Sequence, residues 1–97
     1  MIVMLALFPA SADGGALDAY VQERLAPTLR AAEGIESVVV GSGPMMSPGG
    51  PAPYSGGVVA TFSGLEAMMA FAQSPATDVV RKEGESLGVT VLIFEGR

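Results

Sequence analysis

The stretch MIVMLALFPASADGGALDAYVQERLAPTLRAAEGIESVVV, residues 1–40, changes its hydrophobic pattern twice. Residues 1–8 are apolar throughout and stop at Pro9, which is typical of a strand that is buried on both faces. Between residues 13 and 34, apolar side chains recur at steps of three and four, which predicts an amphipathic helix. Residues 35–40 end in three valines and predict a second strand, because β-branched side chains favour strands.

The predicted helix has clear ends and an irregular middle. Asp13 or Ser11 can cap its first turn by accepting hydrogen bonds from orphan N–H groups, and Gly34 suits the left-handed residue that ends a helix. Pro27 lacks an N–H and clashes with the preceding turn, so we expect one helix kinked there or two short helices. The expected apolar stripe comprises Leu17, Tyr20, Val21, Leu25, Thr28, Leu29 and Ala32.

The next segment, residues 41–57, consists mostly of Gly, Pro and Ser. This composition predicts a long mobile connection and not a tight hairpin turn. Its run GSGPMMSPGG lacks the Lys-Ser/Thr of a phosphate-binding loop and does not open a helix. A third strand is predicted at residues 58–62.

Residues 63–94 predict two more helical segments and a last strand. Ser63 and Glu66 have capping-box spacing, and Ser74 with Pro75 suits an N-cap and a first helical residue. Asp78 and Lys82 form an i,i+4 pair. Gly88 ends the helical part, and residues 89–94 are the fourth strand. The expected apolar positions of these helices are Leu65, Met68, Met69, Ala72, Val79, Val80 and Leu87.

The element order βαββαβ predicts a ferredoxin-like α+β fold in a single domain, residues 1–97. That topology is a four-stranded antiparallel sheet with both helices on one face. The other face stays bare, yet the first and fourth strands are apolar at nearly every position. The chain is 49% hydrophobic and only 15% charged, against a usual charged share of about 25%. We therefore expect a homodimer that buries the bare sheet face.

Charge and composition exclude several functions. The net charge is −5 and only Arg81 and Lys82 are adjacent among the five basic residues, which argues against nucleic acid and anionic membranes as partners. With no cysteine and no histidine, the chain cannot form a disulfide, a Cys/His zinc site or a Ser-His-Asp triad. The acidic residues have no spacing suited to a metal or paired-carboxylate site. We expect no metal.

The N-terminal apolar run raises the alternative of a signal peptide, because an Ala-Ser-Ala run follows it at residues 10–12. No Lys or Arg precedes Arg24, however, and a signal peptide needs a basic start. No apolar run approaches the roughly 20 residues of a membrane-spanning helix. We therefore interpret residues 1–8 as a strand and expect a cytoplasmic protein.

Four segments together resemble EthD-type proteins of the dimeric α/β barrel superfamily: the opening apolar strand followed by proline, DAYVQERLAPTLRAAEGI, PYSGGVVATFSGLEAMMAFAQSP and GVTVLIFEG. The resemblance covers nearly the whole chain. It implies a cofactor-independent protein that binds an apolar or aromatic small molecule, in a superfamily that includes monooxygenases, polyketide cyclases, dehydratase-like enzymes, lactone isomerases and haem-degrading enzymes. EthD-like helices commonly carry Tyr, then Thr-His, then Pro. Tyr20 and Pro27 match, but Arg24 and Leu25 stand where the pair would be, so haem ligation by histidine is excluded.

Six residues are the candidates for binding a substrate: Tyr20, Arg24, Leu25, Tyr54, Met68 and Met69. Tyr20 could donate a hydrogen bond in a cleft, or be a core tyrosine with its hydroxyl at the rim. Glu23 and Arg24 could act as base and oxyanion clamp, or belong to a solvated helix face. Leu25 would fill the space of the missing histidine.

The methionines leave similar alternatives. Met68, Met69 and Phe71 could line an adaptable pocket, or be ordinary helix-to-sheet core. Met45 and Met46 could cover a pocket mouth or a dimer partner. Two functions remain open: a small-molecule enzyme, and a non-catalytic binding or assembly protein that lost the histidine. Tyr20 and Arg24 pointing into one cleft would favour the enzyme. A cleft filled by Leu25, Met68 and Met69 would favour the binding protein.

Overall fold

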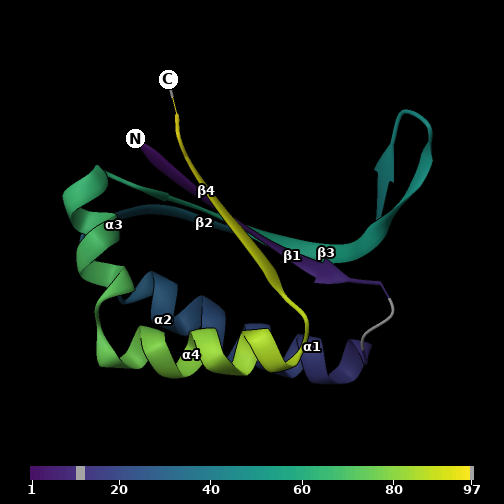
Figure 1. The fold of residues 1–97 in the computed structure, drawn as a ribbon, viewed down its shortest axis with the longest axis horizontal. Helices are drawn as coiled ribbons and strands as arrows, with labels where there is room; N and C mark the ends of the chain where they lie inside the picture. Colours follow the sequence, from purple (N-terminus) through teal and green to yellow (C-terminus); the bar gives the residue numbers. More distant parts are fainter. Residues whose placement is uncertain (11–12, 97) are drawn as a thin grey trace.

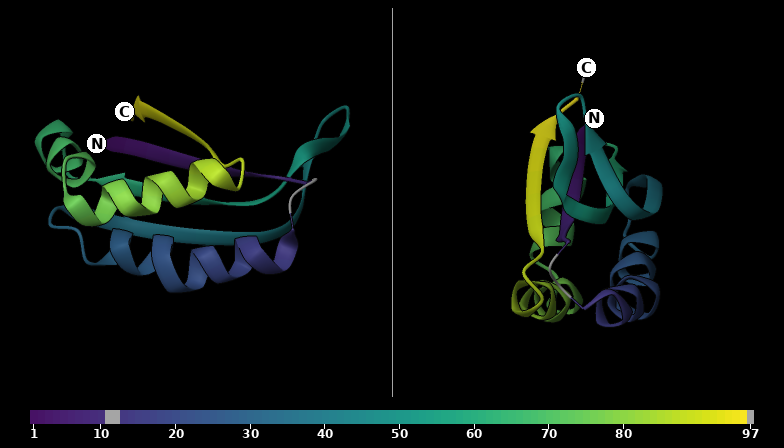
Figure 2. Two further views of the ribbon diagram at one scale, coloured as in Figure 1. Left: turned by 60° about the horizontal axis from the view of Figure 1, so that its bottom comes forward. Right: turned by 90° about the vertical axis from the view of Figure 1, so that its right-hand side faces the viewer.

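The computed structural model describes residues 1–10 and 13–96. Its elements follow the predicted order (Figure 1): β1 Ile2–Pro9, α1 Gly14–Tyr20, η1 Val21–Leu25, α2 Ala26–Arg30, β2 Ile35–Ser47, β3 Gly50–Phe62, α3 Leu65–Ala72, α4 Pro75–Ser86 and β4 Thr90–Glu95. The strands form one antiparallel sheet in the order β2-β3-β1-β4, with the helices on one face (Figure 2). The ferredoxin-like α+β prediction is confirmed.

The core lies between this sheet and the helices. In β1, Ile2, Met4, Ala6 and Phe8 are buried against the helices, while the alternate residues on the other face are only partly buried. Val58, Ala60 and Phe62 of β3 continue the buried layer beside them. This alternation has the period of two that a strand imposes, and it leaves one sheet face uncovered.

The first helix runs continuously from α1 through η1 to α2, so the alternative of two short helices is wrong. Its middle, η1, is a π-helical turn in which the Ala26 N–H donates to the Val21 carbonyl, five residues back. A proline clashes with the carbonyl four residues before it, and the wider turn directly ahead of Pro27 relieves that crowding. Asp13 caps the helix as predicted, whereas Ser11, the alternative cap, lies outside the described residues.

Residues 41–57, which we call the arm, are not the loop that their composition predicts. β2 and β3 extend through them as a long hairpin, with Ser47 paired to Gly50 across a two-residue turn. The register shifts between Gly41 and Pro44 and again before Met46, so the ladder accommodates its Gly and Pro residues at irregular positions. The arm projects away from the helices (Figure 1).

Three local predictions about α3 and α4 are wrong. α3 begins at Leu65, and its N-cap is Gly64, which makes no side-chain cap, so the predicted Ser63–Glu66 capping box is wrong. Its core-facing residues are Ala67, Met68 and Phe71, because the helix is rotated by about one position from the predicted stripe. Leu65, Met69 and Ala72 are exposed, as is Val79 of α4. The Ser74 cap, the Asp78–Lys82 pair and the left-handed Gly88 are confirmed.

The uncovered sheet face is apolar, as expected. Paired positions place Val39, Val59, Leu5 and Leu92 in one row across the four strands. β4 is exposed along its whole length, and Val91, Leu92, Ile93 and Phe94 each keep 49–51% of their surface accessible. An apolar patch of this extent usually marks an interaction site.

Candidate functional site

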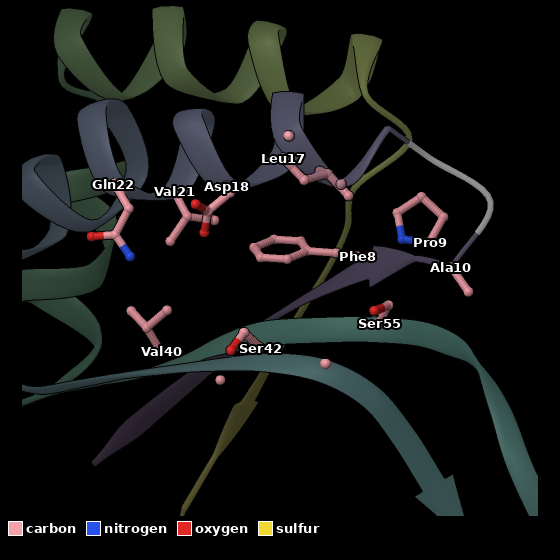
Figure 3. A pocket seen from close by; sticks show the side chains of 14 residues that line it. Phe8, Pro9, Ala10, Leu17, Asp18, Val21, Gln22, Val40, Ser42 and Ser55 are labelled. Carbon is pink, nitrogen blue, oxygen red and sulfur yellow. The ribbon is translucent and has the colours of Figure 1, made fainter.

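A cleft of about 710 Å³ lies between the first helix and the sheet, at the end of β1. Figure 3 shows Asp18, Val21 and Gln22 extending from the helix towards Val40 and Ser42 on β2, with the Phe8 ring between the two elements. Ligand pockets commonly have volumes of about 300–1,000 Å³. The cleft is therefore large enough for an aromatic molecule of two or three rings.

The wall of the cleft near the core is apolar. Phe8, Leu17 and Val21 are each at most 5% exposed and belong to the main hydrophobic core. Val40 packs against the same core from β2. Because these side chains are held by the core on their other sides, the apolar wall is fixed in place before any ligand arrives.

Strand irregularities shape the opposite side. The pairing of β1 with β3 changes register between Leu7 and Pro9, and the pairing of β2 with β3 changes register between Gly41 and Pro44. Both irregularities lie beside the cleft. Bulges of this kind redirect side chains and are frequent next to binding sites. Gly56 has φ +82°, and a Cβ there would lie 2.7 Å from the Gly41 carbonyl oxygen, so only glycine lets the strands approach here.

Polar groups gather at the rim. Asp18 and Gln22 lie one turn apart on the helix, and the hydroxyls of Ser42 and Ser55 come from the sheet side. The start of the helix is anchored by Asp13, whose Oδ1 accepts hydrogen bonds from the N–H groups of Gly15 and Ala16 at 2.9 and 3.2 Å. The arrangement is an apolar wall with a hydrogen-bonding rim.

The structure brings Tyr20, Glu23 and Arg24 together, but outside the cleft. They line a shallower groove of about 260 Å³ between the first helix and α4. The Tyr20 hydroxyl donates to the Val80 carbonyl at 3.0 Å and is buried, and burial together with nearby Glu83 raises its pKa to about 12. Arg24 is exposed, with Nε 3.7 Å from a carboxylate oxygen of Glu83. Tyr20 therefore has the character of a packing tyrosine.

The other predicted binding residues lie outside the lining of the cleft. Leu25 is 6% exposed and packs in the core. Met68 and Phe71 pack against that core from α3, with the Phe71 and Phe62 ring centroids 5.3 Å apart, whereas Met69 is 47% exposed. Tyr54 is partly buried at the base of the arm, in register with Pro9. Their roles in binding a substrate stay predictions.

Sequence reasoning missed Phe8, Asp18, Gln22, Ser42 and Ser55. Two signals could have found them. Asp18 and Gln22 each follow a core residue of the apolar stripe directly, so they lie at its border and not on the fully solvated side. Gly41 and Gly43 interrupt a valine-rich strand, which often marks a bulge or a close backbone approach.

Within the described residues, no three His, Cys, Asp or Glu side chains are grouped so that they could hold a metal ion. The helices found in the same part of the chain lack the length and apolar character needed to cross a membrane.

No protein-family model and no curated protein matches this sequence. Solved structures do match. An ethyl tert-butyl ether D (EthD) family protein from Bacillus halodurans C-125 superposes with a TM-score of 0.80 at 20% identity, covering 100% of this chain and 99% of that one. The chain has a ferredoxin-like fold, and this EthD family protein shares it. At this identity the likeness shows the fold alone and leaves the activity open.

Two further solved structures are similar to this fold. SnoaB from Streptomyces nogalater, a cofactor-independent oxygenase, superposes with a TM-score of 0.73 at 10% identity, covering 99% of this chain and 92% of that one. A dimeric ferredoxin-like protein of unknown function from Thermobifida fusca YX has a TM-score of 0.72 at 16% identity, covering 98% and 90%. The fold therefore occurs both in an oxygenase and in a dimer without an assigned activity.

Proposed function

We propose that the protein binds an apolar or aromatic small molecule in the cleft between the first helix and the sheet, as a homodimer. One observation carries the proposal: a cleft of about 710 Å³ joins an apolar wall, held rigid by the core, to a polar rim at Asp18, Gln22 and Ser42. Apolar lining supplies affinity, and a few polar groups fix the orientation of the ligand.

Binding is the first candidate because Tyr20, Glu23 and Arg24, the groups expected to take part in catalysis, line the helix–helix groove instead. Tyr20 already uses its hydroxyl proton in a bond to the main chain, and its pKa is raised to about 12. A general base works best when its pKa lies near the working pH. Tyr20 is therefore a poor proton acceptor near neutral pH.

Cofactor-independent oxygenation is the second candidate, favoured by the likeness in fold to SnoaB. Such chemistry needs a base that draws a proton from the substrate, and Asp18 is the one ionisable side chain in the described lining of the cleft. Oxygen consumption with a readily oxidised phenol would support catalysis if Asp18→Asn abolished it. Equal consumption by both proteins would exclude this candidate.

The homodimer forms part of the proposal because the uncovered sheet face is apolar and a structural neighbour is dimeric. A twofold axis would place the two open faces against each other and bury Val39, Val59 and Leu92. The cleft lies on the helix side of the sheet, so dimerisation leaves its mouth accessible.

The test of binding uses a matched pair of glutamine substitutions. Gln22→Trp places a bulky ring at the rim of the cleft, whereas Gln73→Trp makes the same change at an exposed position after α3. We expect 2-naphthalenemethanol to bind the wild type and Gln73→Trp alike, and to bind Gln22→Trp at least about tenfold more weakly, in an NMR titration. Equal affinity for all three proteins would refute the cleft as the binding site.

A further inference from the structure

The ionisable side chain in the described lining of the cleft is acidic. Asp18 is the only ionisable side chain among the described residues that line it, and no Lys or Arg is among them. The whole chain carries a net charge of −5. A ligand that enters the cleft therefore meets a carboxylate and no cation.

Three basic side chains form ion pairs away from the cleft. Arg24 faces Glu83 across the helix–helix groove, and Arg81 and Lys82 are tied to Asp78 and, for Arg81, also to Glu85 on α4. Within the described part of the chain, Asp18 takes part in none of the ion pairs or side-chain hydrogen bonds. Its carboxylate is thus available to a ligand.

The neighbours of Asp18 complement a donor-bearing ligand. Gln22 offers an amide oxygen one turn further along the helix, and the Ser42 hydroxyl can accept a hydrogen bond from the facing strand (Figure 3). Both groups can also donate, so the preference for a cation comes from Asp18. An ammonium group has three donors, no acceptor and a charge opposite to that of Asp18. A carboxylate would instead meet the like charge of Asp18, with no Lys or Arg in the described lining to offset it.

We propose that the ligand is an aromatic or aliphatic amine, whose apolar body lies on Phe8, Leu17 and Val21 and whose ammonium group binds Asp18. This inference rests on the proposed function, because it names the ligand class of the same cleft. The selectivity comes from charge: the cleft favours a cation, accepts a neutral alcohol and disfavours an anion.

The experiment compares three probes with one apolar body: 2-naphthylmethylamine, 2-naphthalenemethanol and 2-naphthoic acid, titrated near neutral pH at low salt. An ion pair at a solvent-accessible site contributes up to about 1 kcal/mol, which corresponds to about fivefold in affinity. We therefore expect the amine to bind about fivefold more tightly than the alcohol, and the acid more weakly than either. Added salt should reduce the difference, because it screens the charges.

Two variants separate a local effect from the effect of net charge. Asp18→Asn should bring the affinity for the amine down to that for the alcohol. Glu36→Gln removes the same charge from an exposed position at the far end of β2 and should leave the preference unchanged. Equal effects of the two variants, or equal affinities of the three probes, would overturn the amine assignment.

The outcomes distinguish this inference from the proposal on which it rests. If the three probes bind equally and Gln22→Trp still blocks all of them, the cleft is a binding site without selectivity for amines. If none of the probes binds, the proposed function fails and the amine assignment fails with it.

Discussion

Tyr20 shows how one side chain joins two helices in this protein. It is 5% exposed, and its hydroxyl donates to the Val80 carbonyl on α4. The approach depends on Gly84, because a Cβ there would lie 2.6 Å from the Tyr20 hydroxyl oxygen. The phenol is therefore buried in its neutral form, and its ionisation is linked to unfolding.

The first prediction concerns stability at high pH. The folded pKa of Tyr20 is about 12, above the ordinary 10.0, because burial disfavours the phenolate and Glu83 adds to that effect. The stabilisation is complete below the unfolded pKa and is lost as the pH rises through the folded pKa. Between about pH 9 and about pH 11.5, urea unfolding should show the wild type losing roughly 2 kcal/mol more than Tyr20→Phe. Parallel losses in the two proteins would contradict the burial of Tyr20.

The second prediction compares two neighbours on the first helix. Leu25 is buried in the core, so Leu25→Ala should open a cavity and lower the free energy of unfolding by about 2–5 kcal/mol. The Arg24 side chain is 60% exposed, so Arg24→Ala should cost at most about 1 kcal/mol. Chemical denaturation measures both. The reverse order of effects would mean that the helix is rotated from the orientation described here.

Residue types predicted core positions better than they predicted the binding site. The apolar stripe of the first helix identified Leu17, Val21 and Leu25 as buried, because a period of 3.6 constrains which side of a helix is covered. Asp18 and Gln22 carry the same polarity whether they border a cleft or face water. Their place directly after core residues puts them at the border of the apolar stripe, but the cleft itself is formed by the path of β2 opposite them.

Among the secondary-structure elements, the arm is the part for which amino-acid composition gave a wrong prediction. Gly and Pro favour loops locally, but β2 and β3 pair through the arm and place these residues at register shifts. The π-helical turn η1 could not be predicted from the sequence either. The sequence shows that Pro27 disrupts a regular helix, but a kink, a break or a wider turn could each accommodate it. The order of the elements was predictable, because each strand and helix has its own hydrophobic period.

The third prediction concerns the arm. Its tip projects beyond the helices, and most of its residues are exposed, so the arm shares little of the main core (Figure 1). We expect proteinase K to cut first within residues 41–57, as detected by mass spectrometry, and the rest of the domain to resist cleavage. First cuts between Ser63 and Gly88 would instead identify the second pair of helices as the least stable part.

At the scale of the whole molecule, the open face of the sheet exposes apolar side chains to solvent. It presents Val39, Val59, Leu92 and Phe94, which keep 38–59% of their surface exposed. Removing apolar surface from water lowers the free energy by roughly 25 cal/mol per Å². The apolar character of this face was predictable, because strands that are apolar at nearly every position place half of those side chains on each face.

The fourth prediction is dimerisation through that face. Light scattering at micromolar concentration should give about twice the chain mass of 9.8 kDa. Val59→Glu puts a charge on the open face and should yield monomers, whereas Val79→Glu makes the same change on the exposed side of α4 and should leave the dimer intact. A wild-type protein that stays monomeric would remove the dimer from the proposed function.

The cleft itself is tested by mapping where an apolar probe binds. In an NMR titration with 2-naphthalenemethanol, we expect the largest amide shifts at the residues that line the apolar wall: Phe8, Leu17, Val21 and Val40. Shifts concentrated at Tyr20, Arg24 and Glu83 would place the site in the helix–helix groove instead. That result would contradict the proposal that the ligand lies between the first helix and the sheet.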